Sequence, residues 1–262
     1  MEISGFRVRF RSLMGKPKPI PAAKALLRLT QSNRRFVKNR STGLLGVHRD
    51  VRKLLLKPRG PFAIILSCSD SRAPSEILFD QGLGDLFVIR VAGNVVAPSL
   101  IGSVEFAAAT TQARLVVVMG HTQCGAIQAT FDVVEGKKAA LSENIHDIVD
   151  RILPHIQRLV ARNKGPYSRE DVLRDAVRAN VLASADHLRH GSKFLEDMVR
   201  DNALMIVGAE YDIETGLVDF FDLPLPKSGG ETWVKTLAKI SAMSLAKKSR
   251  KSASRKIARR KI

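Results

Sequence analysis

The chain has 262 residues, of which 45% are apolar and 26% are charged, an ordinary balance for a globular protein with a well-buried core. No stretch approaches the roughly 18 uninterrupted apolar residues of a membrane span. The N-terminus also lacks the apolar segment of a secretory signal, so we expect a cytoplasmic protein. With two cysteines in the whole chain, a disulfide framework is excluded, and metal binding or nucleophilic roles are favoured.

The net charge of +18 is concentrated at the two ends of the chain. Residues 247–262 hold nine Lys or Arg and no acid, and a shorter basic, proline-containing stretch lies near the start. We therefore divide the chain into a basic N-terminal arm (1–21), a folded domain (22–240) and a basic C-terminal tail (241–262) that is expected to be disordered. Clustered positive charge is one route to a nucleic-acid or anionic-membrane tether. Because the tail has no aromatic residue to stack on bases, we expect no specific nucleic-acid binding and at most weak anionic contacts.

Apolar runs and helical patterns alternate along the folded domain. In chain order, the pattern predicts an amphipathic helix at 22–39, a strand at 62–68, a short helix after Pro74, a strand at 86–91, a helix at 99–112, a strand at 115–120, helices between 142 and 200, strands at 203–207 and 217–221, and a helix at 232–240. The first helix packs on its own domain or on a second subunit. The fold class is therefore α/β: a mostly parallel central sheet flanked by helices, with an N-terminal helical arm and an antiparallel edge strand.

Chemically reactive side chains follow two of the predicted strands. Cys68, Asp70 and Arg72 come at the end of the first strand, and His121 and Cys124 follow the third. In a parallel sheet the carboxyl ends of the strands share one edge. Alone, each group has a structural explanation as a buried thiol, a hydrogen-bonded histidine or a surface ion pair. Together, two thiolates and an imidazole form a ligand set that suits zinc, with Cys68 supplying the third ligand beside the His-x-x-Cys turn.

Four motifs resemble those of the β-class carbonic anhydrases. They are Cys-Ser-Asp-Ser-Arg at 68–72, Arg-Val-Ala-Gly-Asn at 90–94, Ser-Val-Glu-Phe-Ala at 103–107 and Gly-His-Thr-Gln-Cys-Gly at 120–125. The similarity extends from about residue 33 to residue 212, and omits the basic ends. It implies reversible hydration of CO2 to bicarbonate and a proton, as well as a homodimer or homotetramer with zinc sites near the interface and N-terminal helices that embrace the partner.

The resemblance also assigns roles to individual residues. It implies that Cys68, His121 and Cys124 hold Zn2+, and that Asp70 either occupies the fourth position or pairs with Arg72 and leaves that position to water. Zinc-bound hydroxide then attacks CO2, while Asp70 orients the hydroxide and Arg72 keeps Asp70 ionised and off the metal. On the substrate side, the resemblance implies that the amide of Gly125 donates to bicarbonate and that Phe87 and Ala92 line the CO2 site.

Three positions depart from common patterns of the family. Arg59 stands where many members have a substrate-binding glutamine, and its charge is expected to affect bicarbonate release. Ile65 and Phe106 replace the tryptophan and tyrosine of a subgroup that bicarbonate switches off, so we expect no such switch. The same zinc ligands also occur in relatives that hydrolyse carbon disulfide or carbonyl sulfide, and the sequence leaves that alternative open.

Overall fold

The structure is a computed structural model that describes residues 19–42, 60–137, 142–162, 168–223, 235 and 238–240. Most of the basic N-terminal arm, Arg59 and the C-terminal tail lie outside the described residues. The predicted helix at 232–240 lies largely outside them too, although its described residues are helical. Among the described helices, none combines the length and apolar character that crossing a lipid bilayer requires.

A five-stranded sheet forms the centre of the fold, with strand order β2-β1-β3-β4-β5. The strands are β1 (Ala63–Cys68), β2 (Leu86–Val91), β3 (Leu115–His121), β4 (Met205–Tyr211) and β5 (Val218–Asp222). The first four run parallel, and β5 pairs antiparallel with β4 at one edge, which confirms the predicted fold class. The prediction ended β4 four residues too early. Gly208, Ala209 and Glu210 have weak strand propensity, but pairing with β3 continues through all three.

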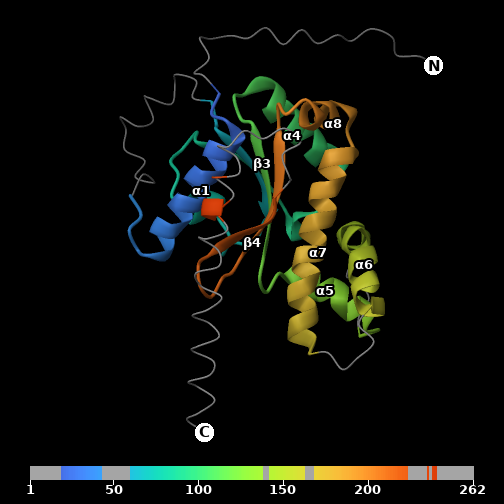
Figure 1. Ribbon diagram of the computed structural model, residues 1–262. Coiled ribbons are helices and arrows are strands. Elements are labelled where there is room, and N and C mark those ends of the chain that lie inside the picture. The colour runs from blue at the N-terminus through green and yellow to red at the C-terminus, as the bar shows by residue number, and fades with distance from the viewer. Residues whose placement is uncertain are drawn as a thin grey trace, which may run out of the picture.

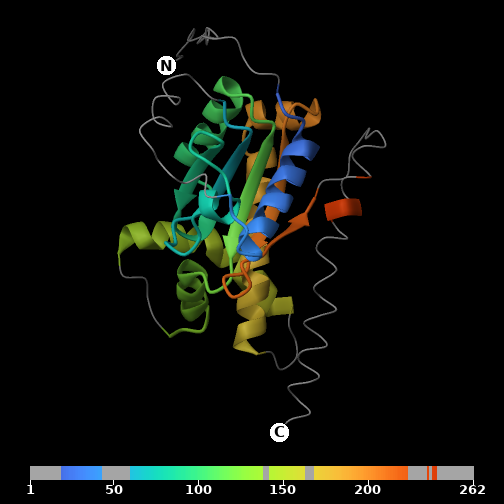
Figure 2. The ribbon, with the colours of Figure 1, turned by 90° about the vertical axis from the view of Figure 1, so that its left-hand side faces the viewer.

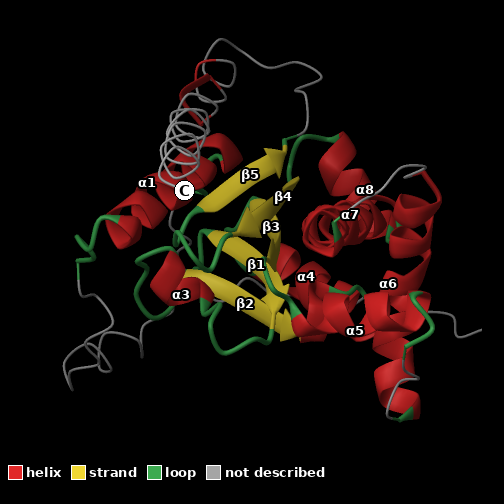
Figure 3. Cartoon of the chain, turned by 90° about the horizontal axis from the view of Figure 1, so that it is seen from below, coloured by secondary structure: helices red, strands yellow, loops and turns green. Residues whose placement is uncertain are grey.

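Helices cover both faces of the sheet (Figures 1 and 2). They are α1 (Ala22–Val37), α3 (Ser75–Leu78), α4 (Pro98–Thr110), α5 (Gly125–Val134), α6 (Glu143–Arg162), α7 (Arg169–His190) and α8 (Lys193–Arg200), with a 3-10 turn η1 at Ala92–Asn94. Figure 3 shows α1 and α3 on one side of the sheet and α4, α7 and α8 on the other, with α5 and α6 on that same side. Two of these helices have serine N-caps: Ser168 and Ser192 accept hydrogen bonds from amides in the first turns of α7 and α8.

The core has two layers because both faces of the central strands are covered. All six residues of β1 and all seven of β3 are buried. Alternate side chains of these strands enter either the layer under α1 or the layer under α4 and α7. Leu26 and Leu29 of α1 pack in the first layer, so α1 lies on the sheet of its own chain.

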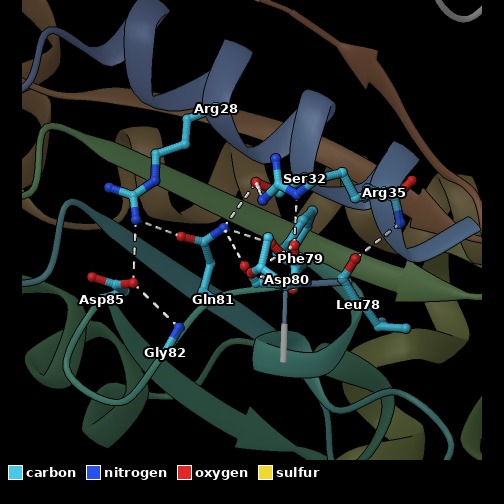
Figure 4. Close-up of polar contacts among 11 residues, drawn as sticks. Arg28, Ser32, Arg35, Leu78, Phe79, Asp80, Gln81, Gly82 and Asp85 are labelled. Carbon is cyan, nitrogen blue, oxygen red and sulfur yellow. Dashed lines mark hydrogen bonds and ion pairs between the residues drawn. The ribbon is translucent and has the colours of Figure 1, made fainter. Parts of the chain in front are cut away.

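Polar contacts fix α1 to the segment that follows α3 (Figure 4). Arg28 donates to the side chains of Gln81 and Asp85 at 2.7 and 3.2 Å, and Gln81 donates to Ser32 at 2.9 Å. Asn33 Nδ2 donates to the carbonyls of Leu78 and Gly216, at 3.1 and 2.9 Å. These bonds hold α1 against the segment that precedes β2 and against the turn between β4 and β5.

Candidate metal centre

The ends of β1 and β3 bring three ligand-type side chains together. The chain leaves β1 toward β2 on one side and leaves β3 toward β4 on the other, so the gap between them is the switch point where such sheets bind ligands. Cys68 ends β1, His121 ends β3, and Cys124 directly precedes α5. Their ligand atoms all lie within 4.8 Å of one another, and the two Sγ atoms are 4.0 Å apart. The structure therefore assembles the three predicted ligands.

A two-residue turn sets the geometry of His121 and Cys124. Thr122 N donates to Tyr211 O at 2.9 Å, and Gln123 adopts a left-handed backbone with φ of 59°. The Thr122 carbonyl accepts a bond from His121 Nδ1 at 2.9 Å, which leaves the lone pair on Nε2. That Nε2 is buried and finds no hydrogen-bond partner among the described residues. A buried imidazole nitrogen beside two sulfurs fits a metal ion, and zinc is the metal that this donor set suits.

Glycines bring the backbone close to the cluster at two points. Gly93 has φ of 67°, and its amide donates to Cys68 Sγ at 3.4 Å. Asn180 of α7 donates to Gly93 O at 2.6 Å and so holds this segment. At Gly120, a Cβ would lie 2.7 Å from Val181 Cγ2, so only glycine lets α7 approach β3 just before His121.

The thiol pKa values of Cys68 and Cys124 are shifted in opposite directions. The hydrogen bond from Cys124 lowers the pKa of Cys68 to about 4, against the opposing effect of burial and with help from His121. The same bond and burial raise the pKa of Cys124. Without a metal, Cys68 therefore carries a thiolate at neutral pH, and a thiolate is the form that binds metal ions.

Asp70 lies beside the cluster but is bound to Arg72. Its Oδ1 accepts from Arg72 Nε at 3.0 Å, and its Oδ2 accepts from Nη2 at 2.8 Å. The Arg72 side chain holds the pKa of Asp70 well below its usual range, so the carboxylate stays ionised. Asp70 Oδ2 is 3.8 Å from His121 Nε2. The structure thus shows the paired arrangement of the two that the resemblance implies.

Arg90 is a site residue that the sequence interpretation missed, because it was noted only as part of a motif. From β2, its Nε donates to Cys68 O at 3.1 Å and its Nη2 donates to Asp70 O at 2.5 Å. Both carbonyls belong to the segment that carries a ligand and the carboxylate, so Arg90 fixes the path between them. Its sequence position before Gly93 offers no signal of this role, which depends on the pairing of β1 with β2.

The predicted substrate-side residues are dispersed. Gly125 is the first residue of α5 and is exposed, and Ala92 follows Val91, the residue paired with Cys68. Phe87 instead pairs with Ile64, four residues before Cys68 and about 13 Å away along the strand. The structure therefore does not bring Phe87 to the metal cluster of its own chain. Arg59 lies outside the described residues.

The two positions associated with the bicarbonate switch lie in different environments. Ile65 is fully buried in the layer beneath α1. Phe106 on α4 is 52% exposed, and its ring centroid lies 6.5 Å from that of Phe87. Neither residue is among the three ligand-type side chains of the cluster.

A sequence model of the carbonic anhydrase family matches residues 63–218. A carbonic anhydrase of Mycolicibacterium smegmatis is 35% identical over 207 residues, which cover 79% of this chain and 95% of that protein. The solved β-carbonic anhydrase CcaA superposes with a TM-score of 0.59 at 26% identity, covering 76% of this chain and 95% of that one.

The chain belongs to the β-class carbonic anhydrase family. One of two tetrameric β-carbonic anhydrases of Sordaria macrospora shares the fold, with a TM-score of 0.56 at 18% identity over 76% of this chain and 97% of that one. The match to the family model begins at the first residue of β1 and ends at the first residue of β5. It therefore contains the whole metal centre of this β-carbonic anhydrase family member, whereas α1 and the basic ends lie beyond it. The relatives named here are all carbonic anhydrases, so they support neither sulfur substrates nor a nucleic-acid function.

A cavity of about 620 Å³ opens beside the metal centre. Thr122, Gln123 and Cys124 form one wall, and the others come from α5, α7 and the turn between β4 and β5. Its apolar part consists of Ile127, Leu173 and Val177. The cavity therefore lies on the side of Cys124 formed by α5 and α7, and Asp70 is not part of its lining.

Proposed function

We propose that this family member holds Zn2+ through Cys68, His121 and Cys124 and catalyses the reversible hydration of CO2 to bicarbonate and a proton. The observation that carries the proposal is the buried, unpartnered Nε2 of His121 beside the two sulfurs, with the Asp70–Arg72 pair next to it. Zinc in such a site supplies a Lewis acid that lowers the pKa of water and so provides a nucleophile near neutral pH. The family membership of the chain supports the same reaction.

Four residues around the metal centre have separate roles in the reaction. Asp70, kept ionised by Arg72, presents a carboxylate oxygen that accepts a hydrogen bond from the attacking water and orients its lone pair toward CO2. Arg72 holds the same carboxylate off the metal position. The exposed amide end of α5 at Gly125 favours the negative charge of bicarbonate, because a helix N-terminus attracts anions. Ala92 contributes an apolar surface next to Cys68.

We propose that the enzyme works as a homodimer or a homotetramer. Phe106 and Phe87 lie together at the edge formed by α4 and β2, and Phe106 is exposed although it is a large apolar side chain. Phe87 is also too far from the metal centre of its own chain to contact CO2 there, so a role at the substrate site requires a second copy. A relative with this fold is tetrameric.

Two further roles stay proposals. Arg59 is proposed to bind bicarbonate in place of the glutamine of many relatives. A cytoplasmic location is proposed because both thiols must stay reduced to bind the metal. The two Sγ atoms are 4.0 Å apart, close enough that an oxidising compartment would favour their oxidation over metal binding.

Stopped-flow CO2 hydration tests the function directly. We expect the zinc-loaded protein to hydrate CO2 and Asp70→Asn to lose at least about a hundredfold in kcat/KM, because the amide lacks the charge that orients the nucleophile. A parallel assay measures sulfide release from carbonyl sulfide and carbon disulfide. Rapid sulfide release without CO2 hydration would overturn the proposal in favour of the sulfur substrates.

A further inference from the structure

Two residues share the guanidinium of Arg72. Asp70 accepts bonds from Nε and Nη2, as described above. In the turn between His121 and Cys124, the Gln123 carbonyl accepts a hydrogen bond from Arg72 Nη2 at 3.2 Å, and Gln123 Oε1 lies 3.5 Å from Arg72 Nη1. Arg72 thus connects the loop after β1 to the turn that carries His121 and Cys124.

We propose that Gln123 is a positioning residue that holds Arg72 where it keeps Asp70 off the metal. The inference rests on the proposed function, in which Asp70 either pairs with Arg72 or occupies the metal's fourth position. The hydrogen bonds that link Gln123 to the loop after β1 run to Arg72. Gln123 acts through Arg72 alone.

The backbone makes Gln123 a rigid reference point. Its left-handed conformation is unfavourable for a glutamine, but the residues on either side leave no alternative. The Thr122 amide is bonded to the Tyr211 carbonyl, and Cys124 directly precedes α5, whose Gln128 amide donates to the Cys124 carbonyl at 3.0 Å. The Gln123 carbonyl and side chain are therefore fixed relative to His121 and Cys124, and they fix Arg72 in turn.

Arg72 needs such a support because its own loop does not confine it. Its side chain is 47% exposed, and a long exposed arginine loses considerable rotamer freedom when it is held in one geometry. In the paired arrangement, the hydrogen bonds of Arg72 to both Asp70 and Gln123 offset this loss of rotamer entropy. Once Asp70 turns to the metal, Gln123 still holds the guanidinium in the position to which Asp70 must return. Loss of the Gln123 side chain therefore favours the arrangement in which Asp70 blocks the metal.

The expected effect is modest because the contact is exposed and long. A side-chain hydrogen bond of this strength changes an equilibrium by about two- to fivefold. The turn between His121 and Cys124 does not otherwise depend on the Gln123 side chain. Gln123→Gly, which adopts the left-handed conformation without strain, therefore separates the effect of the side chain from that of the backbone.

The test measures the equilibrium with a probe that needs an open metal position. Azide binding to the Co2+-substituted protein, followed by the visible spectrum, gives an apparent affinity that is proportional to the fraction of protein in which Asp70 is off the metal. Gln123→Ala and Gln123→Gly should each weaken azide binding about two- to fivefold, with a matching loss in kcat/KM for CO2.

Two controls make the result specific. Gln128→Ala removes the same residue type from the lining of the same cavity, and the hydrogen bonds of Arg72 to described residues do not involve Gln128, so azide affinity should stay unchanged. In an Arg72→Lys background, Gln123→Ala should have no further effect, because Gln123 acts only through the guanidinium.

Equal losses from Gln123→Ala in the wild-type and Arg72→Lys backgrounds would overturn the inference, as would unchanged azide binding in Gln123→Ala and Gln123→Gly. The azide assay does not require CO2 turnover. A protein that binds azide as expected but does not hydrate CO2 would therefore contradict the proposed function and leave the role of Gln123 standing.

Discussion

Arg178 of α7 is predicted to be necessary for the stability of the sheet edge beside the metal centre. Its Nε donates to Glu210 Oε2 at 2.7 Å, and its Nη2 donates to Asp219 Oδ2 at the same distance. Glu210 is paired with Gly120 in the sheet, its side chain is only 7% exposed, and its Oε1 has no partner among the described residues. Arg178→Met retains the aliphatic volume of the side chain but removes the charge that compensates a buried carboxylate.

The structure sets both the size and the pH dependence of the effect. Removal of one partner from a buried ion pair costs about 3–5 kcal/mol, and we expect about 3 kcal/mol because Arg178 itself is one-third exposed. Burial already raises the pKa of Glu210 above its ordinary value of 4.5, with Arg178 opposing the rise. In Arg178→Met the folded-state pKa rises further. A raised carboxyl pKa gives stability that is present below the unfolded value and is lost as the pH rises through the folded value.

Equilibrium urea unfolding of wild type and Arg178→Met, at fixed protein and zinc concentrations, measures the difference. The loss should be largest near pH 8 and should shrink as the pH falls toward 5. Adding Glu210→Gln to Arg178→Met should recover part of the stability at pH 8, because the amide needs no counter-charge. A loss below about 1 kcal/mol that does not change with pH would refute the reasoning.

Three further outcomes follow from other parts of the structure. Gly120→Ala should lower the melting temperature, measured by calorimetry, and weaken zinc retention against a chelator, measured by metal analysis. The new Cβ would lie 2.7 Å from Val181 Cγ2 and force α7 away from the site. In metal-free protein, ultraviolet titration should reveal one thiolate per chain with a midpoint of about 4. Cys124→Ala, which removes the hydrogen-bond donor, should move that midpoint upward, and a single midpoint near 9 in the wild type would contradict the thiol pairing. Asn33→Ala should cost about 2–4 kcal/mol in chemical unfolding, because its amide makes three bonds of 2.9 to 3.1 Å across α1, α3 and the β4–β5 turn.

The sheet and the ligand set could be predicted because their signals are local in the sequence. Buried parallel strands appear as short apolar runs, and the rule that their carboxyl ends share an edge places Cys68 near His121 without any knowledge of side-chain contacts. The spacing of His121 and Cys124 predicted two ligands from a single turn, with Cys68 as the third. The Asp70–Arg72 pair also lies within three residues, and the structure confirms that these two side chains bond to each other.

Other features depend on contacts between distant parts of the chain. The distance of Phe87 from the metal follows from the register of β1 with β2, and the role of Arg90 depends on the same pairing. Glu210 lies in the buried strand β4, and the residue that compensates its charge, Arg178, comes from α7, 32 residues away. The left-handed backbone of Gln123 is imposed by its neighbours and has no signature in a glutamine.

The most direct test of the central claim is zinc content measured together with CO2 hydration on the same samples of wild type and His121→Ala. Wild type should contain one zinc per chain, lose hydration activity on chelation and regain it with added Zn2+. His121→Ala should bind zinc much more weakly and show little hydration, because it lacks the buried Nε2 beside the two sulfurs. Hydration at the wild-type rate by zinc-free protein, or by His121→Ala, would contradict the account.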